Sequence, residues 1–204
     1  MKIVAVSQRV DRYLDREETR DSLDQRLYRF ISSAGFFPVA VPNYLCGSDT
    51  SQEKNCVHLS RWLEAINPKG FILSGGNDIG YSIERDHTET QLLDHASKCK
   101  LPVLGICRGM QMIGNWSGMD LKSVKEHSRT RHLLFGEISG EVNSYHKFAL
   151  ASCPYGYKVI AHSEDKEIEA IKSLCLPWEA WMWHPEREAE FTNRDINRTE
   201  ALLA

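Results

Sequence analysis

Short runs of aliphatic and β-branched residues alternate along this chain with segments whose apolar residues recur at helical spacing. In the first half the expected strands are 3–6, 36–41, 70–73 and 102–106, and the expected helices are 23–34, 57–66 and 88–99. This order favours a parallel sheet, because each helix carries the chain back to start the next strand in the same direction. We therefore expect an α/β fold with a mostly parallel central sheet and helices on both faces.

The expected elements in the second half of the chain follow a different pattern. After about residue 130 the expected strands are short and closely spaced, at 132–135, 141–144, 157–162, 168–171 and 178–183. Strands with so little chain between them indicate hairpins, so we expect a small antiparallel extension, followed by a closing helix within 186–204. The 204 residues contain no internal repeat, linker or low-complexity tract, which predicts a single domain over residues 1–204.

Composition narrows the classes of partner. The chain is 42% hydrophobic and 26% charged, with a formal net charge of −3, which provides no electrostatic case for a nucleic-acid or membrane partner. The first apolar run, 3–6, is too short for a signal-peptide core, and no window approaches the roughly 20 apolar residues of a membrane span. We therefore expect a cytoplasmic protein that acts on a small molecule, and we leave a homodimer open.

The cysteines and histidines show no familiar ligand spacing. The six cysteines form no C-x-x-C pair, and we expect them to be reduced thiols rather than a disulfide framework. The eight histidines include no H-x-x-x-H pair and no combination with cysteine that suggests zinc. The sequence thus predicts neither a metal nor a cofactor.

One cysteine stands in a special setting. Cys107 is the centre of the pentapeptide Gly105–Gly109 and follows the expected strand 102–106 directly, while 110–116 is expected to open a helix. A nucleophile on a tight strand-to-helix turn needs small neighbours, because the turn is strained and bulky side chains would collide. The alternative is a buried cysteine in a glycine turn, where it is simply a small hydrophobic residue.

A histidine and a glutamate follow the last expected strand. His184 and Glu186 flank Pro185, and residues two apart in extended backbone point to the same side. His184 could then accept the proton of Cys107, with Glu186 orienting the imidazole. The alternative is a surface histidine beside a helix-capping glutamate.

Two further clusters are candidates for substrate contacts. Ser74–Asp78 contains two glycines after an expected strand, and we assign the backbone N–H groups of Gly76 and Arg108 to an oxyanion hole. The alternative for the glycine pair is a plain turn. The stretch 142–146 places polar groups on or beside a short strand, for which the alternative is a hairpin with a satisfied histidine.

Taken together, these motifs resemble the class I glutamine amidotransferase superfamily, in particular its stand-alone γ-glutamyl hydrolase branch. The matching stretches are 75–79, 105–111, 142–146 and 184–186, and a fifth, 18–26, resembles the segment that opens the first helix in this branch. The resemblance implies a Cys107–His184–Glu186 triad, a γ-glutamyl thioester on Cys107 and its hydrolysis by water. It also implies that Gln111 and the backbone around Ser144 and Tyr145 hold the amino-acid end of the glutamyl group, with Asn143 and His146 as further substrate-binding candidates.

The resemblance also bears on the substrate. The branch usually continues after Asn143-Ser144 with paired histidines and a glutamine, whereas this chain has His146-Lys147-Phe148 and is shorter. Both departures disfavour γ-glutamyl-γ-aminobutyrate. Compact members of the branch act in bacterial capsule decoration, which implies γ-glutamyl-CDP-amidate as substrate, with some of six arginines facing its diphosphate: Arg9, Arg12, Arg16, Arg20, Arg129 and Arg131. The alternatives are a γ-glutamyl-γ-aminobutyrate-type hydrolase and a glutaminase subunit that feeds ammonia to a synthetase.

Overall fold

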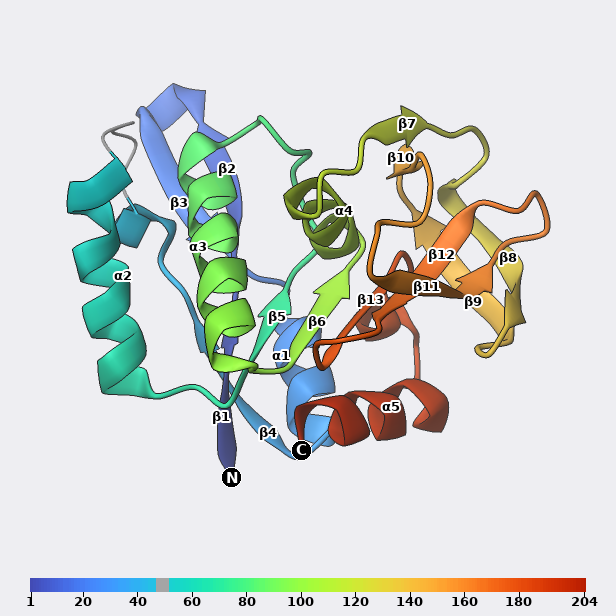
Figure 1. Ribbon diagram of the computed structural model, residues 1–204. Helices are drawn as coiled ribbons and strands as arrows, with labels where there is room; N and C mark the ends of the chain where they lie inside the picture. The colour runs from blue at the N-terminus through green and yellow to red at the C-terminus, as the bar shows by residue number, and fades with distance from the viewer. Residues whose placement is uncertain (47–51) are drawn as a thin grey trace.

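A nine-stranded sheet runs through the whole molecule, with helices on both faces (Figure 1). The computed structural model describes residues 1–46 and 52–204, with side chains from residue 57 onward in the second range. The strand order is β4-β1-β5-β6-β13-β12-β11-β8-β9. The first five of these strands are parallel and the remainder are joined by antiparallel pairing. The expected α/β class with an antiparallel extension is confirmed.

The parallel half contains the strands expected from the first half of the sequence and one from its end. Its strands are β4 (Phe36–Ala40), β1 (Lys2–Val6), β5 (Gly70–Leu73), β6 (Val103–Ile106) and β13 (Trp178–Trp181). Because β5, β6 and β13 are parallel neighbours, the loops that follow them meet at one edge of the sheet. These loops carry the glycine pair, the cysteine and the late histidine singled out in the sequence.

Helices cover the parallel half on both sides because its strands are apolar on both faces. One apolar core lies under α1 (Gln25–Ser33) and α5 (Asn193–Leu203). The other lies under α2 (Gln52–Ile66), α3 (Ile83–Cys99) and α4 (Arg108–Trp116). Residues that are adjacent on β1 divide between the two cores, Val4 and Val6 facing one and Ala5 the other.

The antiparallel half continues the same sheet. It comprises β12 (Ile168–Ser173), β11 (Tyr157–His162), β8 (Ser128–Gly136) and β9 (Gly140–Tyr145). A small two-stranded sheet of β7 (Leu121–Ser123) and β10 (Phe148–Leu150) lies beside it. The polar residues expected in the 142–146 cluster therefore lie on β9 and just after it.

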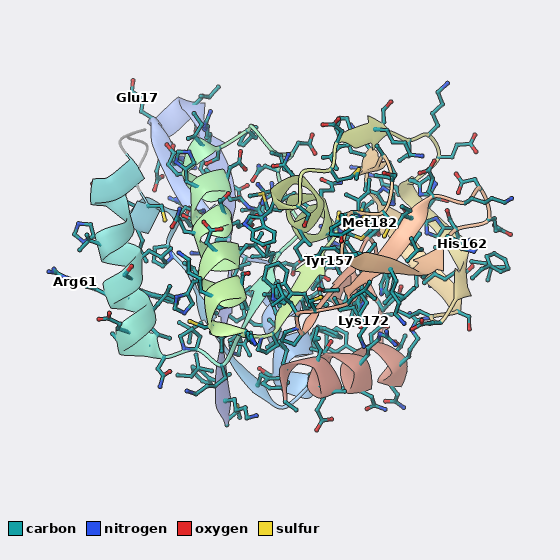
Figure 2. All side chains as sticks on the ribbon, in the orientation of Figure 1. Glu17, Arg61, Tyr157, His162, Lys172 and Met182 are labelled. Carbon is teal, nitrogen blue, oxygen red and sulfur yellow. The ribbon has the colours of Figure 1, made fainter. Side chains whose placement is uncertain are left out.

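The segment 18–26 differs from the expectation that it opens the first helix. Residues Glu18–Ser22 form β3, which pairs with β2 (Arg9–Tyr13) as an antiparallel hairpin whose tip carries Glu17 (Figure 2). The helix begins only at residue 25, where the Asp24 carboxylate accepts a hydrogen bond from the backbone N–H of Arg26 at 2.9 Å. An N-cap at this position ends the hairpin and starts α1.

Two further expectations from the sequence concern membrane-spanning helices and disulfides. In the described part of the molecule, no helix has the length and apolar character needed to cross a bilayer. No disulfide joins the five cysteines whose side chains are described, and the Cys56 side chain lies outside the described residues.

Candidate active site

Cys107 occupies a strained turn between β6 and α4. Its backbone has φ 51° and ψ −104°, a conformation that costs an ordinary residue about 1–3 kcal/mol. The Cys107 N–H donates a 2.7 Å hydrogen bond to the carbonyl of Trp181 on the neighbouring strand, which holds the turn in place. Cys107 is the N-cap residue of α4, so its side chain stands at the start of that helix.

Glycines on either side of Cys107 are required by space. A Cβ on Gly105 would lie 2.8 Å from the carbonyl carbon of Gly109, and a Cβ on Gly109 would lie 2.1 Å from the Leu73 oxygen. Both separations are far inside van der Waals contact, so either substitution would push the turn away from the sheet. The small neighbours expected from the sequence thus have a steric reason.

His184 and Glu186 form a buried pair beside Cys107. The Nδ1 atom of His184 lies 2.6 Å from Oε1 of Glu186, and both side chains are about 95% or more buried. Burial lowers the His184 pKa, but the charges of Cys107 and Glu186 and hydrogen bonds to both outweigh it and raise the pKa to about 9. The imidazole is thus placed beside the candidate nucleophile, where it can take part in proton transfer.

The backbone of His184 is held by Asn143 on β9. The Asn143 side chain donates to the His184 carbonyl at 2.8 Å and accepts from the His184 N–H at 3.0 Å. Gly75 makes room for the ring, since a Cβ there would lie 2.4 Å from Cε1 of His184. Sequence reasoning missed this role of Gly75, for which the only signal was the glycine pair.

A buried ionic network joins the glycine loop to the cysteine turn. Glu89 on α3 forms ion pairs with Arg85 and Arg108. The Arg85 guanidinium donates to the carbonyl of Ser74 at 2.7 Å and to that of Gly75 at 3.2 Å. Burial lowers the pKa of Arg85 to about 10 and that of Arg108 to about 9. Sequence reasoning made no prediction for Arg85 and Glu89, whose signal was their i, i+4 spacing; Arg85 lies before the start of the expected helix 88–99.

Most of the predicted site residues line one open cavity of about 320 Å³. Cys107, His184, both residues assigned to the oxyanion hole, and Gln111, Tyr145 and His146 face it. The ring of Tyr145 meets that of His184 edge-on, with 5.8 Å between centroids. Glu186 lies behind the imidazole, in a smaller adjoining cavity. The assignment of individual roles to these residues stays a prediction.

Two of the residues implied to hold the glutamyl group lie outside the cavity lining. Asn143 is engaged with the His184 backbone, and the Ser144 hydroxyl donates at 2.6 Å to the carbonyl of His127. The Gln111 amide donates to the Phe148 carbonyl at 2.9 Å. These contacts give Asn143 and Ser144 positions from which they support the wall of the cavity.

Besides Arg108, whose guanidinium is paired with Asp86 and Glu89, three cationic residues line the cavity: Arg9, Lys147 and Arg187. Of the six arginines considered in the sequence, only Arg9 is among the lining residues. Arg131 instead forms ion pairs with Glu141 and Glu188. Sequence reasoning missed Arg187 and Lys147, although each is adjacent to a motif residue. The guanidinium of Arg187 lies over the Tyr145 ring, 4.6 Å from its centroid.

Comparison with known proteins decides the family. The family model for glutamine amidotransferase class-I matches residues 19–202, nearly the whole chain, including Cys107, His184 and Glu186. The chain belongs to the class-I glutamine amidotransferase family. Membership confirms the resemblance drawn from the sequence motifs.

Among curated proteins, this amidotransferase-family chain is 33% identical over 134 residues to a γ-glutamyl-CDP-amidate hydrolase from Campylobacter jejuni, a match covering 63% of this chain and 67% of that protein. It is 33% identical over 128 residues to a glutamine-hydrolyzing GMP synthase subunit from Methanocaldococcus jannaschii, with 58% of this chain and 64% of the relative covered. The matches therefore span about two thirds of each relative.

Solved structures of amidotransferases share the fold. A protein from Thermoplasma acidophilum, solved as a candidate GMP synthase subunit, has a TM-score of 0.74 and 19% identity, with 100% of this chain and 94% of that chain covered. A glutamine amidotransferase from Thermotoga maritima has a TM-score of 0.64 and 15% identity, covering 97% and 80% of the two chains.

Proposed function

We propose that this protein is a cysteine-dependent hydrolase that cleaves a γ-glutamyl amide and releases L-glutamate. The observation that carries the proposal is the strained turn of Cys107 beside the buried His184–Glu186 pair, with Cys107 and His184 lining one cavity. Family membership supports the reaction class, since the match to the glutamine amidotransferase class-I model covers Cys107, His184 and Glu186.

In the proposed reaction the Cys107 sulfur attacks the γ-carbonyl carbon of the substrate. The carbonyl oxygen gains negative charge and is stabilised by the N–H groups of Gly76 and Arg108. His184 gives its proton to the leaving nitrogen, the C–N bond breaks, and a γ-glutamyl thioester remains on Cys107. His184 then takes a proton from water, which attacks the thioester and releases glutamate, while Glu186 keeps the imidazole oriented.

For the substrate, we propose γ-glutamyl-CDP-amidate, with release of a cytidine diphosphoramidate for capsule modification. The Campylobacter jejuni relative supports this choice by its name. The cations Arg9, Lys147 and Arg187 support it by their charge, because a diphosphate leaving group needs cationic partners where it emerges from the site.

The test is an assay of the purified protein with free glutamate as the readout. The substrates are γ-glutamyl-CDP-amidate, γ-glutamyl-γ-aminobutyrate and glutamine, and we expect the highest kcat/KM for the first. Lys147→Gln should raise KM for the diphosphate substrate about tenfold, the cost of one lost charged contact of about 1.4 kcal/mol, and leave KM for glutamine unchanged. The matched control is Lys98→Gln, at an exposed lysine on α3. Equal turnover of γ-glutamyl-γ-aminobutyrate would contradict the proposed substrate.

The likeness to GMP synthase subunits favours a second candidate, a glutaminase subunit that hands ammonia to a synthetase. This candidate predicts that glutamine is the preferred substrate and that its hydrolysis accelerates when a synthetase partner is added. A stand-alone hydrolase instead reaches its full rate as the isolated protein.

A further inference from the structure

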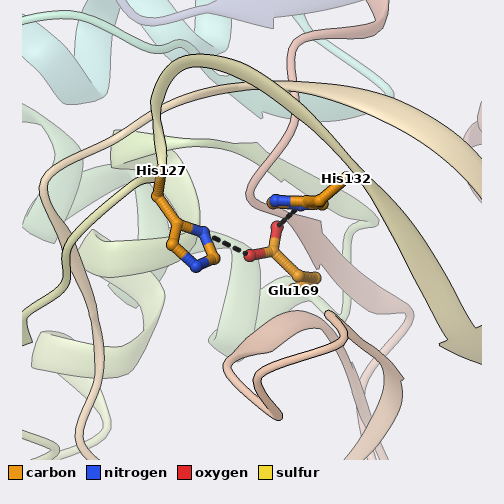
Figure 3. A group of neighbouring side chains, drawn as sticks. All are labelled: His127, His132 and Glu169. Carbon is orange, nitrogen blue, oxygen red and sulfur yellow. Dashed lines mark ion pairs between the residues drawn. The ribbon is translucent and has the colours of Figure 1, made fainter.

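Four side chains that belong to different segments meet inside the antiparallel half. His127 precedes β8, His132 lies on β8, His146 follows β9, and Glu169 lies on β12. The side chains of Glu169 and His146 are fully buried, that of His127 is 4% exposed and that of His132 9%. Figure 3 shows the carboxylate of Glu169 between the imidazoles of His127 and His132.

In this His127–His132–His146–Glu169 cluster, one ligand atom from each of His127, His132 and Glu169 lies within 4.8 Å of the others, close enough for a shared cation, and His146 contacts the same carboxylate. Oε1 of Glu169 lies 3.3 Å from Nδ1 of His127 and 3.3 Å from Nε2 of His146. Its Oε2 lies 3.3 Å from Nε2 of His132. Tetrahedral Zn²⁺ with bonds of about 2.0–2.1 Å keeps its ligand atoms about 3.3–3.4 Å apart. A direct hydrogen bond between an imidazolium and a carboxylate is shorter, about 2.7–2.9 Å.

In His127 and His146, the ring nitrogen that points away from Glu169, here called the outer nitrogen, already has a hydrogen-bond partner. Nε2 of His127 lies 3.0 Å from Oδ2 of Asp165, and Nδ1 of His146 lies 3.1 Å from the Phe148 carbonyl oxygen. Both oxygens are acceptors, so the outer nitrogens carry hydrogens and, in a neutral ring, the inner nitrogen carries a lone pair. The inner nitrogens of His127 and His146 lie 3.2 Å apart, within hydrogen-bond distance. With both outer nitrogens protonated, this contact needs a positive charge, either a proton on one ring or a metal ion nearby.

The carboxylate of Glu169 is buried without hydrogen bonds from residues 1–46 and 57–204. Among the described residues, both of its carboxylate oxygens and Nε2 of His132 are buried without a hydrogen bond. The ion pairs that Glu169 forms within the described part of the chain are with imidazoles alone. A buried carboxylate left without hydrogen bonds costs several kcal/mol, and a coordinated cation would remove that cost.

We propose that His127, His132 and Glu169 bind one divalent transition-metal ion, with Zn²⁺ as the preferred occupant and His146 packed beside its ligands. Imidazole nitrogens with one carboxylate form a donor set that suits Zn²⁺, whereas Ca²⁺ and Mg²⁺ require mainly oxygen ligands. Asp165 orients the ligating ring of His127, and the Phe148 carbonyl orients the neighbouring ring of His146. The sequence predicts no metal because the histidines and Glu169 come from separate segments and have no compact spacing.

The metal site adjoins the candidate active site. His146 lines the catalytic cavity, and the Phe148 carbonyl that holds its ring also accepts the hydrogen bond of Gln111. The carbonyl of His127 accepts from the Ser144 hydroxyl and from the His146 N–H. A bound cation would therefore fix the end of β9, and with it the cavity wall, so its role is one of positioning.

The alternative is that protons on the imidazoles, rather than a metal ion, balance the charge of the Glu169 carboxylate. The contact with the Glu169 carboxylate, followed by that with Asp165, raises the pKa of His127 to about 9 although burial opposes the shift. Protonated imidazoles would then neutralise the carboxylate. The two accounts differ in one measurable respect, which is whether the folded protein retains a stoichiometric metal ion.

The experiment equilibrates the purified protein with Zn²⁺, removes free metal by dialysis, and measures the retained metal by mass spectrometry. We expect one Zn²⁺ per chain in the wild type. His132→Gln and Glu169→Gln should retain close to none, with folding checked by circular dichroism. His162→Gln is the matched control, because His162 lies on β11 in the same half of the molecule but outside the cluster (Figure 2).

A variant at the exposed Asp165 provides a second test that does not depend on the folding of His132→Gln and Glu169→Gln. The Asp165 side chain is 57% exposed, so Asp165→Asn should fold normally, and it should weaken Zn²⁺ affinity by about 10–100-fold. Competition with a chromophoric chelator measures that affinity. The proposal is overturned if the wild type retains no stoichiometric Zn²⁺, or if Asp165→Asn and the folded core variants retain it as tightly as the wild type.

Discussion

His184 and Glu186 are two residues apart, and the carboxylate approaches the imidazole to 2.6 Å on the side facing away from the catalytic cavity. Pro185 lies between them and starts a short 3₁₀ turn, Pro185–Arg187. The imidazole therefore stands between a buried anion and the sulfur of Cys107.

Removing the sulfur should abolish turnover. We expect Cys107→Ala to lower kcat by about 10⁴-fold or more, since the proposed covalent path is lost. Mass spectrometry of the wild type treated with a glutamine-analogue electrophile should find the adduct on Cys107. An adduct on Cys46 or Cys99 in place of Cys107 would contradict the assignment of the nucleophile.

The ionisation of His184 provides a pH prediction. Its pKa of about 9 lies above the ordinary value of 6.5, so the folded state holds a proton that the unfolded state releases between these values. The resulting stabilisation is complete below pH 6.5 and is lost as the pH rises through about 9. Imidazole NMR should place the His184 midpoint near 9, and Glu186→Gln should lower it. That variant should also reduce kcat, by less than Cys107→Ala does.

Gly75 is expected to be essential for activity although it carries no functional group. In Gly75→Ala the new methyl group would occupy the place of the His184 ring and displace it from Cys107, lowering kcat by about 10²-fold. Gly118→Ala is the control, because a Cβ there meets open space while φ is 79°. It should cost about 1 kcal/mol of unfolding free energy and leave kcat intact. Equal activity of the two variants would refute the steric role.

Glu89 should dominate the stability of the site. Glu89→Gln would leave the guanidinium groups of Arg85 and Arg108 buried without their shared anion, and would weaken the 2.7 Å hydrogen bond from the Ser7 hydroxyl. We expect a loss of about 3–5 kcal/mol in the free energy of unfolding, measured by urea denaturation. Glu84→Gln, at the partly exposed start of α3, should change stability by less than about 1 kcal/mol. A small effect at Glu89 would mean that the network contributes little.

The local pattern of the sequence determined the α/β class, the positions of most strands and the motifs around Cys107 and His184. Hydrophobic period and turn residues act over a few neighbours, so they can be recognised without the fold. The hairpin β2–β3 was hidden because its strands are largely polar and exposed and lack the apolar alternation of a buried strand.

The tertiary structure alone decided which groups meet. Arg85 and Glu89 are ordinary helix residues in the sequence, and only the packing of α3 against the sheet buries them under the cysteine turn. Likewise, His132 and Glu169 are far apart in the sequence and become neighbours only through strand pairing. Such encounters depend on strand order and register, which long-range burial selects and which no local pattern encodes.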